Sequence, residues 1–286
     1  MTIRNPLEWG ADQLKFGSHA LRTGGQSVFH AEENLNLLAP AVHRIGLRDL
    51  RDALVKGFED FGHYRTDVLY LCLIYPVVGL VLARAMVGQD MIPLLFPLAS
   101  GFALIGPFAA IGLYEMSRRR ELGEPSSWGA AFGVLRTPRF GVILMVGAIL
   151  AAIFVLWMVT ANIIYNATLG PDEPASLGLF LDEVFGTTAG WTLIVVGCGV
   201  GLVFAVAAMA IGVVSFPLLL DRDVGADTAI WTSVRAVVAN PIPMAAWGLI
   251  VAAGLVVGSI PLFVGLIVVM PVLGHATWHL YRKMVN

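Results

Sequence analysis

Six stretches of this chain are almost free of charge, and we interpret each as a helix that crosses a lipid bilayer. A helix needs about 20 apolar residues to span the hydrocarbon, where its own hydrogen bonds must satisfy the backbone. The predicted spans are Val68–Met86, Met91–Glu115, Phe140–Tyr165, Trp191–Leu220, Pro243–Val257 and Pro261–Leu280. The sequence therefore predicts an all-α, polytopic membrane helix bundle with about six transmembrane helices.

Internal sequence signals refine the bounds of the fourth span and the boundary between the last two. The fourth apolar run is long for a single crossing, so we expect one tilted helix that loosens near Phe216 and Pro217. The stretch from Met244 to Leu280 is nearly unbroken, and we divide it at Gly258-Ser259-Ile260-Pro261, because glycine and proline suit a tight hairpin.

The chain also repeats itself at an offset of 103 residues. The matched pairs are Glu124 with Asp227, Trp128 with Trp231, Val134 with Val237, Leu135 with Val238, and Pro138 with Pro241. Each copy holds an apolar run, a short polar connection and a proline that opens a second apolar run. This pattern predicts a parallel internal repeat, in which spans two and three correspond to spans four and five.

Charge distribution predicts the orientation of the bundle. Charged residues make up only 13% of the chain, and the basic ones gather in particular connections. Spans two and three, for example, are joined by a stretch that carries Arg118, Arg119, Arg120, Arg136 and Arg139. Arg222 and Arg235 follow span four, and Arg282 and Lys283 follow span six, whereas Asn166–Thr188 has acidic residues and no lysine or arginine. The positive-inside rule then places both termini in the cytoplasm, with Arg118–Arg120, Arg282 and Lys283 as topology anchors.

Outside the spans, the sequence predicts three regions and several helices at the membrane surface. Residues 1–44 are expected to form an N-terminal cytoplasmic arm, residues 45–66 an interfacial amphipathic helix, and residues 67–286 the transmembrane bundle. The apolar face of the amphipathic helix would be formed by Leu47, Leu50, Leu54, Phe58 and Phe61. Trp128, Trp231 and Trp278 are the expected interfacial tryptophans.

One pair of side chains has the spacing of a chemical site. His275 and His279 share one helix face, a spacing that suits two ligands of one metal ion, and His63 is the candidate third ligand. The alternative is that these histidines cap a helix C-terminus or bond to their neighbours. The predicted spans hold no mid-membrane acid or base, which argues against ion coupling, and no nucleophile or nucleotide-binding motif is present. No cofactor is predicted.

Three parts of the chain carry a family resemblance: Ile45–Leu50 with Gly57-Phe58-Glu59-Asp60, the connection around Tyr114-Glu115 and Gly123-Glu124, and Leu273–Arg282. They resemble a known family of bacterial integral membrane proteins, the domain-of-unknown-function 2189 family. The resemblance covers about residues 44–283 and implies a multi-span protein of the bacterial inner membrane. The family has no assigned functional residues to carry over. Some members are labelled as related to cytochrome c oxidase subunit I, but this chain lacks the several intramembrane histidines that haem and copper ligation would require.

These observations leave three hypotheses for function. The first is a non-enzymatic accessory or scaffold protein of a bacterial inner membrane, associated with another membrane complex such as a respiratory one. The second is a carrier or channel for lipid or apolar solute between the two repeated hairpins. The third is a metal-binding membrane protein that uses His63, His275 and His279. The expected partners are the lipid bilayer and a membrane complex, and a net charge of −2 gives no reason to expect nucleic acid.

Overall fold

The computed structural model describes residues 40–63, 84, 92–124, 133–134, 137, 139–170, 174, 176–261 and 263–285. The predicted first span, apart from Arg84, lies outside the described residues. So do the interfacial residue Trp128 and all of the N-terminal arm before Pro40.

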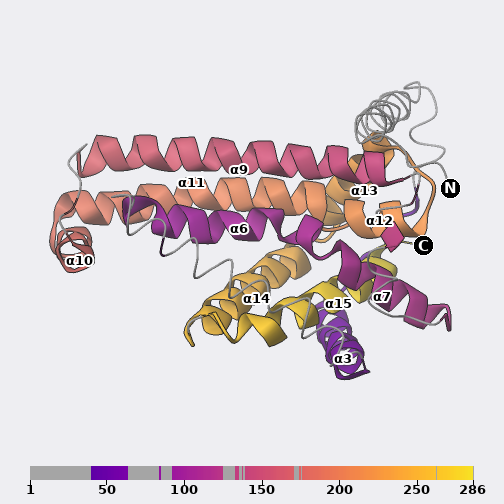
Figure 1. The fold of residues 1–286 in the computed structure, drawn as a ribbon. Helices are drawn as coiled ribbons and strands as arrows, with labels where there is room; N and C mark the ends of the chain where they lie inside the picture. The colour runs from indigo at the N-terminus through magenta and orange to yellow at the C-terminus, as the bar shows by residue number, and fades with distance from the viewer. Residues whose placement is uncertain are drawn as a thin grey trace, which may run out of the picture.

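Three long helices lie side by side and form the main body of the molecule (Figure 1). They are α6 (Leu95–Ala109), which follows the short 3₁₀ turn η2 (Ile92–Leu94), α9 (Phe140–Thr168) and α11 (Thr188–Gly212). A short helix, α10 (Leu177–Gly186), connects α9 and α11 at one end of this body. Its N-terminus is capped by Ser176, whose hydroxyl accepts a hydrogen bond from the backbone N–H of Leu179.

Three helical segments of the described chain are long and apolar enough to cross a membrane. They are Phe140–Thr168, Thr188–Asp221 and Pro241–Ser259, with mean hydropathies of 2.9, 2.6 and 1.9. These segments correspond to predicted spans three, four and five, so the all-helical membrane character is confirmed. Predicted spans two and six are not among these three segments. Helix α6 is too short, because it ends after 15 residues, and the last helix is not apolar enough, because it carries histidines and basic residues.

Spans two and four are both interrupted near their ends. After α6 the chain bends at Ala110 and continues as α7 (Ile111–Glu121). After α11 it breaks at Val213 and Val214 and continues as α12 (Ser215–Asp221). Pro217 explains the second break, because a proline has no N–H and its ring clashes with the carbonyl four residues earlier, that of Val213. The break therefore lies slightly before the predicted position.

The last two helices form the expected hairpin. Helix α14 (Pro241–Ser259) and helix α15 (Leu266–Met284) are separated by a turn that follows the predicted division point. The hairpin closes tightly because Gly258 and Gly265 meet: a Cβ added to Gly265 would lie 2.8 Å from the Cα of Gly258. Phe263, in the turn, takes a positive φ of 66°.

The amphipathic helix α3 (Leu47–His63) is present and packs against α15, but its buried face only partly matches the predicted one. Its buried residues are Leu50, Ala53, Gly57 and Asp60, whereas Leu47 and Phe58 are more than half exposed. The reason is the close approach of the two backbones at Gly57, where an added Cβ would lie 2.7 Å from the carbonyl oxygen of Val272. Small residues, rather than the largest apolar ones, therefore define the contact.

Helix α13 (Ala226–Ala239) turns its apolar stripe outward. Trp231 and Val238 are exposed, whereas Thr232, Ser233 and Ala236 are buried. The buried Ser233 hydroxyl accepts a hydrogen bond from the backbone N–H of Val214, at the break that precedes α12. The interfacial role of Trp231 stays a prediction.

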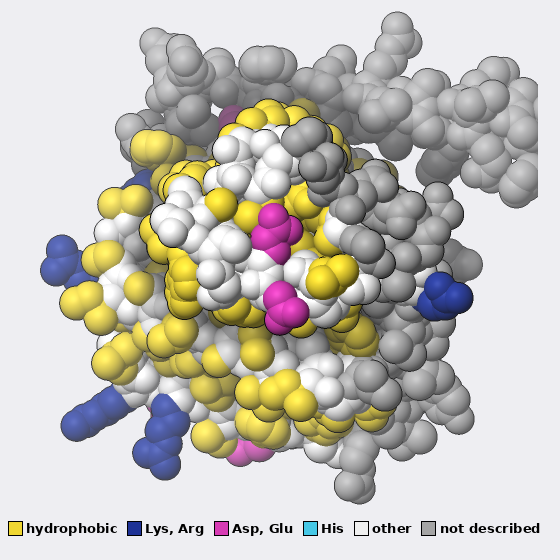
Figure 2. All heavy atoms as spheres, turned by 90° about the vertical axis from the view of Figure 1, so that its left-hand side faces the viewer, with side chains coloured by type: hydrophobic (Ala, Val, Ile, Leu, Met, Phe, Trp, Pro, Cys, Tyr) yellow, Lys and Arg dark blue, Asp and Glu magenta, His cyan; other side chains and the backbone are white. Residues whose placement is uncertain are grey.

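Apolar side chains also cover the surface of the long helices. Large exposed hydrophobic residues occur along α9, α11 and α14, among them Val155, Val159, Val195, Val203 and Leu249. In Figure 2, which looks onto the α10 end, acidic side chains lie among hydrophobic ones near the centre, and Lys and Arg side chains project at the margins. Water would penalise so much contiguous apolar surface, whereas lipid would not.

The largest fully buried side chains gather at the opposite end of the body, where α7, α12 and α15 meet. They are Tyr114, Phe216, Trp278 and Tyr281, each less than about 2% exposed. The ring centroids of Trp278 and Tyr281 are 5.4 Å apart. This packed end holds the polar groups described next.

Candidate functional site

A buried polar cluster joins three helices that are far apart in the sequence. It consists of Asp60 from α3, Ser117 and Arg120 from α7, and His275 and His279 from α15. Asp60, Ser117 and His275 are at most 3% exposed. We call these five residues the Asp60 cluster.

Asp60 is the centre of this cluster. Its Oδ2 accepts hydrogen bonds from the Ser117 hydroxyl at 2.5 Å and from Nε2 of His279 at 2.9 Å, and its Oδ1 accepts one from the Arg120 guanidinium. The Ser117 oxygen lies 2.8 Å from Nδ1 of His275. Because the serine hydrogen is donated to Asp60, Nδ1 of His275 must be the donor in this last bond.

The pKa of Asp60 reflects two opposing causes. Burial alone would raise the pKa of this carboxyl, but the hydrogen bonds from His279 and Ser117, together with the charge that either imidazole carries when protonated, outweigh it. The pKa of Asp60 is therefore lowered from its ordinary value. Asp60 is ionised at neutral pH, and its charge binds α3 to α7 and α15.

The Asp60 cluster contains a serine, a histidine and an aspartate, but it does not have the geometry of a nucleophilic triad. In a triad the carboxylate orients the imidazole and the opposite ring nitrogen faces the serine hydroxyl. Here the carboxylate bonds the serine directly, and the distance from Asp60 Oδ2 to Nδ1 of His275 is 3.9 Å. Ser117 is only 1% exposed, so a substrate could not reach its hydroxyl. The arrangement is suited to joining helices.

The predicted histidine pair shares one helix face and meets at Asp60, but His63 is not part of the cluster. His63 is the exposed last residue of α3, and Asp60, one turn earlier, occupies the place between the two histidines. In the part of the chain that the structure describes, no group of three His, Cys, Asp or Glu side chains is arranged to hold a metal ion. The metal hypothesis therefore gains no support from the geometry.

The C-terminal turns of α15 make further polar contacts with α3, α7 and α12. Trp278 Nε1 donates to Glu121 at 3.0 Å, and the Tyr281 hydroxyl donates to Asp221 at 2.7 Å. Arg282 pairs with Glu121 and Asp221, and Lys283 pairs with Asp49 and Asp52 on α3. Burial, and the hydrogen bond to Asp221, raise the pKa of Tyr281. Helices α3, α7 and α12 are thus all attached to α15.

The residues that precede α3 are also attached to this end of the molecule. Val42 pairs with Val285 in an isolated antiparallel bridge, and His43 donates its backbone N–H to the carbonyl of Met284 at 2.8 Å. The buried side chain of Asn240 accepts a hydrogen bond from the backbone N–H of Ile45 and donates one to the backbone carbonyl of His43. Both ends of the described chain therefore meet beside α13.

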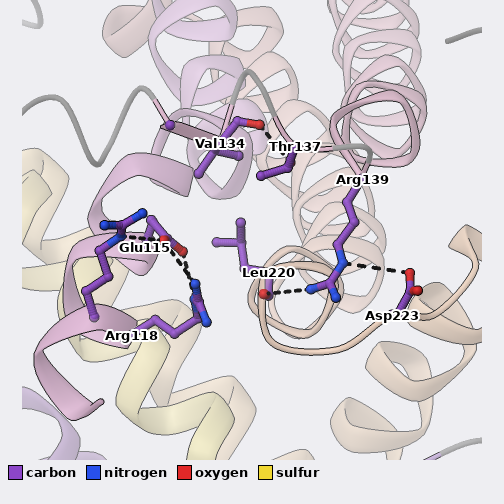
Figure 3. A pocket seen from close by; sticks show the side chains of 9 residues that line it. Glu115, Arg118, Val134, Thr137, Arg139, Leu220 and Asp223 are labelled. Atoms are coloured by element: carbon purple, nitrogen blue, oxygen red, sulfur yellow. Dashed lines mark hydrogen bonds and ion pairs between the residues drawn. The ribbon is translucent and has the colours of Figure 1, made fainter. Parts of the chain in front are cut away.

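A separate cavity of about 400 Å³ lies between α7 and the start of α9 (Figure 3). Its charged side chains are Glu115, Arg118, Arg119, Arg139 and Asp223. Glu115 is 4% exposed and accepts two hydrogen bonds from Arg118, at 2.8 and 3.1 Å, and one from Nε of Arg119 at 2.7 Å. Across the cavity, Arg139 donates to the backbone carbonyl of Leu220 and lies 3.7 Å from Asp223. We call this the arginine pocket.

The predicted topology anchors all take part in these contacts. Arg118 and Arg119 line the arginine pocket, Arg120 binds Asp60, and Arg282 and Lys283 attach α15 to its neighbours. Trp278, expected at the membrane interface, is instead 1% exposed, because its ring packs against Tyr281 and its N–H bonds Glu121.

Sequence reasoning missed the acceptors at this end of the molecule. Asp60, Glu115, Glu121 and Asp221 looked like ordinary charges near the ends of helices, and Ser117 carried no signal. One clue was available: three of the four acids lie in the same connections as the arginines, which suggests pairing. The partners of Asp60, Ser117 and Glu121 on α15 are more than 150 positions away in the sequence, so local spacing could not reveal them.

A family model described as a predicted integral membrane protein, DUF2189, matches residues 95–221. This match agrees with the resemblance found in the sequence, over a range that runs from the start of α6 to the end of α12. The DUF2189 region contains Ser117, Arg120 and Glu115, whereas Asp60 and both histidines lie outside it. No curated protein and no solved structure shows a significant match to the chain.

Proposed function

We propose that this chain is a non-enzymatic accessory or scaffold protein of a bacterial inner membrane, associated with another membrane complex such as a respiratory one. The observation that carries the proposal is the fixed attachment of α3 to α15. Lys283 binds Asp49 and Asp52, Asp60 binds His279, and Gly57 lies against the α15 backbone. A helix held this firmly at the end of a membrane bundle provides a rigid surface for a partner.

The outer face of α3 supports an interaction role. Leu47, Val55 and Phe58 are 58%, 49% and 57% exposed, and they lie along one side of the helix. Exposed charged residues of both signs, among them Arg51, Asp52 and Lys56, accompany them. An apolar stripe bordered by charges of both signs suits an amphipathic surface of a membrane complex at the level of the lipid headgroups.

The six-span topology with a parallel repeat is part of the same proposal. Helix α6 ends at Ala109 and helix α11 ends at Gly212, and these two ends are 103 positions apart, the offset of the sequence repeat. Helices α9 and α14 each begin at or just after the repeated proline, Pro138 or Pro241. Helices α6, α7 and α9 would then correspond to α11, α12 and α14.

The placement of charge supports a cytoplasmic position for both termini. The basic residues of α7 and α15 lie at the end of the bundle where the described chain begins and finishes (Figure 1). The opposite end carries α10, with exposed Asp182 and Glu183. By the positive-inside rule the first end faces the cytoplasm.

The scaffold proposal is tested by native electrophoresis and cross-linking of the full chain extracted gently from its own membranes. The wild type should migrate in a complex of fixed stoichiometry, and the double variant Leu47→Gln, Phe58→Gln should lose it. Leu122→Gln, which changes an equally exposed leucine at the end of α7, should keep the complex and serves as the control. A wild-type chain recovered alone, or a double variant that retains the complex, would contradict the proposal.

One observation favours a second candidate, a carrier for lipid or apolar solute. A groove of about 230 Å³ runs between α6, α9 and α11, lined largely by apolar residues that include Leu104, Trp157 and Leu202. Purified protein in vesicles should then speed the transfer of a fluorescent lipid between leaflets, and Gly201→Trp, which fills the groove, should stop it. Transfer at the rate of protein-free vesicles would exclude this candidate.

A further inference from the structure

The arginine pocket has the size and charge of a binding site for a small anion. Its volume of about 400 Å³ is within the range of small-molecule sites, roughly 300–1,000 Å³. Three guanidinium groups, from Arg118, Arg119 and Arg139, line it together with two carboxylates, from Glu115 and Asp223. The two acids differ in burial, and this difference decides what the pocket can bind.

Glu115 is a buried acid that fixes the arginines in place. Its side chain is 5% exposed. Its carboxylate accepts hydrogen bonds from both Nε and Nη2 of Arg118, but only from Nε of Arg119. In the described part of the chain, the terminal nitrogens of Arg119 have no hydrogen-bond acceptor. Glu115 thus orients Arg119 and leaves its outer edge, which carries two N–H donors of fixed geometry, available to a ligand.

Asp223 is an exposed acid that is only loosely paired. Its side chain is 89% exposed and lies 3.7 Å from Nε of Arg139, a distance too long for a hydrogen bond. An exposed ion pair of this kind contributes little to stability. A stronger anion could therefore replace Asp223 at Arg139, whose Nη1 is already fixed by the carbonyl of Leu220.

The position of the pocket indicates where such an anion would come from. Arg139 directly precedes Phe140, the first residue of one candidate span, and Leu220 lies in the last turn of another. In a bilayer, the phosphate groups of the lipids lie at the ends of the spans. Val134 and Leu220 add apolar lining beside the arginines, next to which the glycerol end of a lipid could lie.

We propose that the arginine pocket binds a phosphate ester, supplied by the headgroup of an anionic phospholipid. The phosphate oxygens accept hydrogen bonds from Arg119, which is bound to Glu115, and from Arg139, which lies across the pocket from Glu115 (Figure 3). Asp223 moves away toward solvent. The Thr137 hydroxyl, which donates to the carbonyl of Val134, lies at the same pocket. This site does not depend on the scaffold role, because it requires only the membrane position of the spans.

The test uses the full chain purified in a neutral detergent, with bound lipid counted by native mass spectrometry. Phosphatidylglycerol should bind with one equivalent held most tightly. The double variant Arg119→Gln, Arg139→Gln should weaken this binding at least roughly tenfold, the loss expected for charge-assisted hydrogen bonds. Asp223→Asn, which removes the competing acid, should strengthen it. Arg282→Gln, which changes an arginine outside the pocket, should leave it unchanged.

Two further probes separate the sources of the phosphate. Glycerol phosphate and inorganic phosphate should compete only at far higher concentrations than phosphatidylglycerol; equal competition by either would support a phosphate site that serves a soluble ester and overturn the lipid source. Equal binding of phosphatidylglycerol by the wild type and the double variant, with both chains folded by circular dichroism, would overturn the site itself.

Discussion

Asp60 and His279 are 219 positions apart in the sequence, and their side chains meet at 2.9 Å. The contact joins the first described helix to the last. It lies in a buried cluster in which Ser117 and Arg120 also bind the same carboxylate. Removing the charge of Asp60 therefore tests whether this cluster holds the end of the bundle together.

Asp60→Asn should destabilise the protein by about 1.5–3 kcal/mol, the usual effect of losing hydrogen bonds to a buried charged group. An amide cannot accept from Ser117, Arg120 and His279 as a carboxylate does. Unfolding in detergent, followed by circular dichroism, measures the change. Asp52→Asn is the control, because Asp52 is largely exposed, and it should change stability by less than about 1 kcal/mol. Equal effects of the two variants would show that the cluster is not important for stability.

The stability of the wild type and that of Asp60→Asn should respond differently to acid. The folded state lowers the pKa of Asp60, so this carboxylate stabilises the fold at pH values above its ordinary pKa, and the contribution is lost as the pH falls through the lower folded-state value. The stability difference between the wild type and Asp60→Asn should therefore be full at pH 7 and shrink below about pH 4. A difference that stays constant from pH 7 to pH 3 would show that the ionised form of Asp60 is not responsible.

Two glycines on α3 provide a matched test of helix contact. Alanine at Gly62 meets nothing within 4 Å, so Gly62→Ala should leave stability unchanged or raise it by up to about 1 kcal/mol through helix propensity. Alanine at Gly57 would lie 2.8 Å from the backbone nitrogen of Ala276, so Gly57→Ala should push α3 away from α15. Hydrogen exchange of residues 47–63 would detect the release. If Gly57→Ala is as well protected as Gly62→Ala, the two helices do not pack as described.

Tyr281→Phe tests the attachment of α15 to α12. The ring is buried and its hydroxyl donates to Asp221 at 2.7 Å. Phenylalanine keeps the packing and removes this bond, so the free energy of unfolding should fall by about 1–2 kcal/mol. Thermal unfolding in detergent measures the loss. An unchanged midpoint would mean that water replaces the hydroxyl at Asp221 at no cost.

Sequence patterns predicted the helices better than their contacts. Long apolar runs indicated α9, α11 and α14, and Gly258 with Pro261 indicated the final hairpin, because lipid permits few other structures for such segments. The buried face of α3 was predicted only in part, because periodicity favours large residues such as Phe58, whereas Ala53 and Gly57 allow the closer approach. The partners of His275 and His279 were missed, since nothing local to either histidine specifies Asp60 or Ser117.

The account rests on a membrane body whose arginine-rich end faces the cytoplasm. The most direct test is labelling of single cysteines with a maleimide that cannot cross membranes, in a chain whose Cys72 and Cys198 are replaced by serine. A cysteine at Asp182, on α10, should react in intact spheroplasts, whereas a cysteine at Asp223, beside the arginine pocket, should react only in inverted vesicles; both positions are exposed. Reaction of both cysteines from the same side, or reaction of the Asp223 position in intact spheroplasts, would contradict the account.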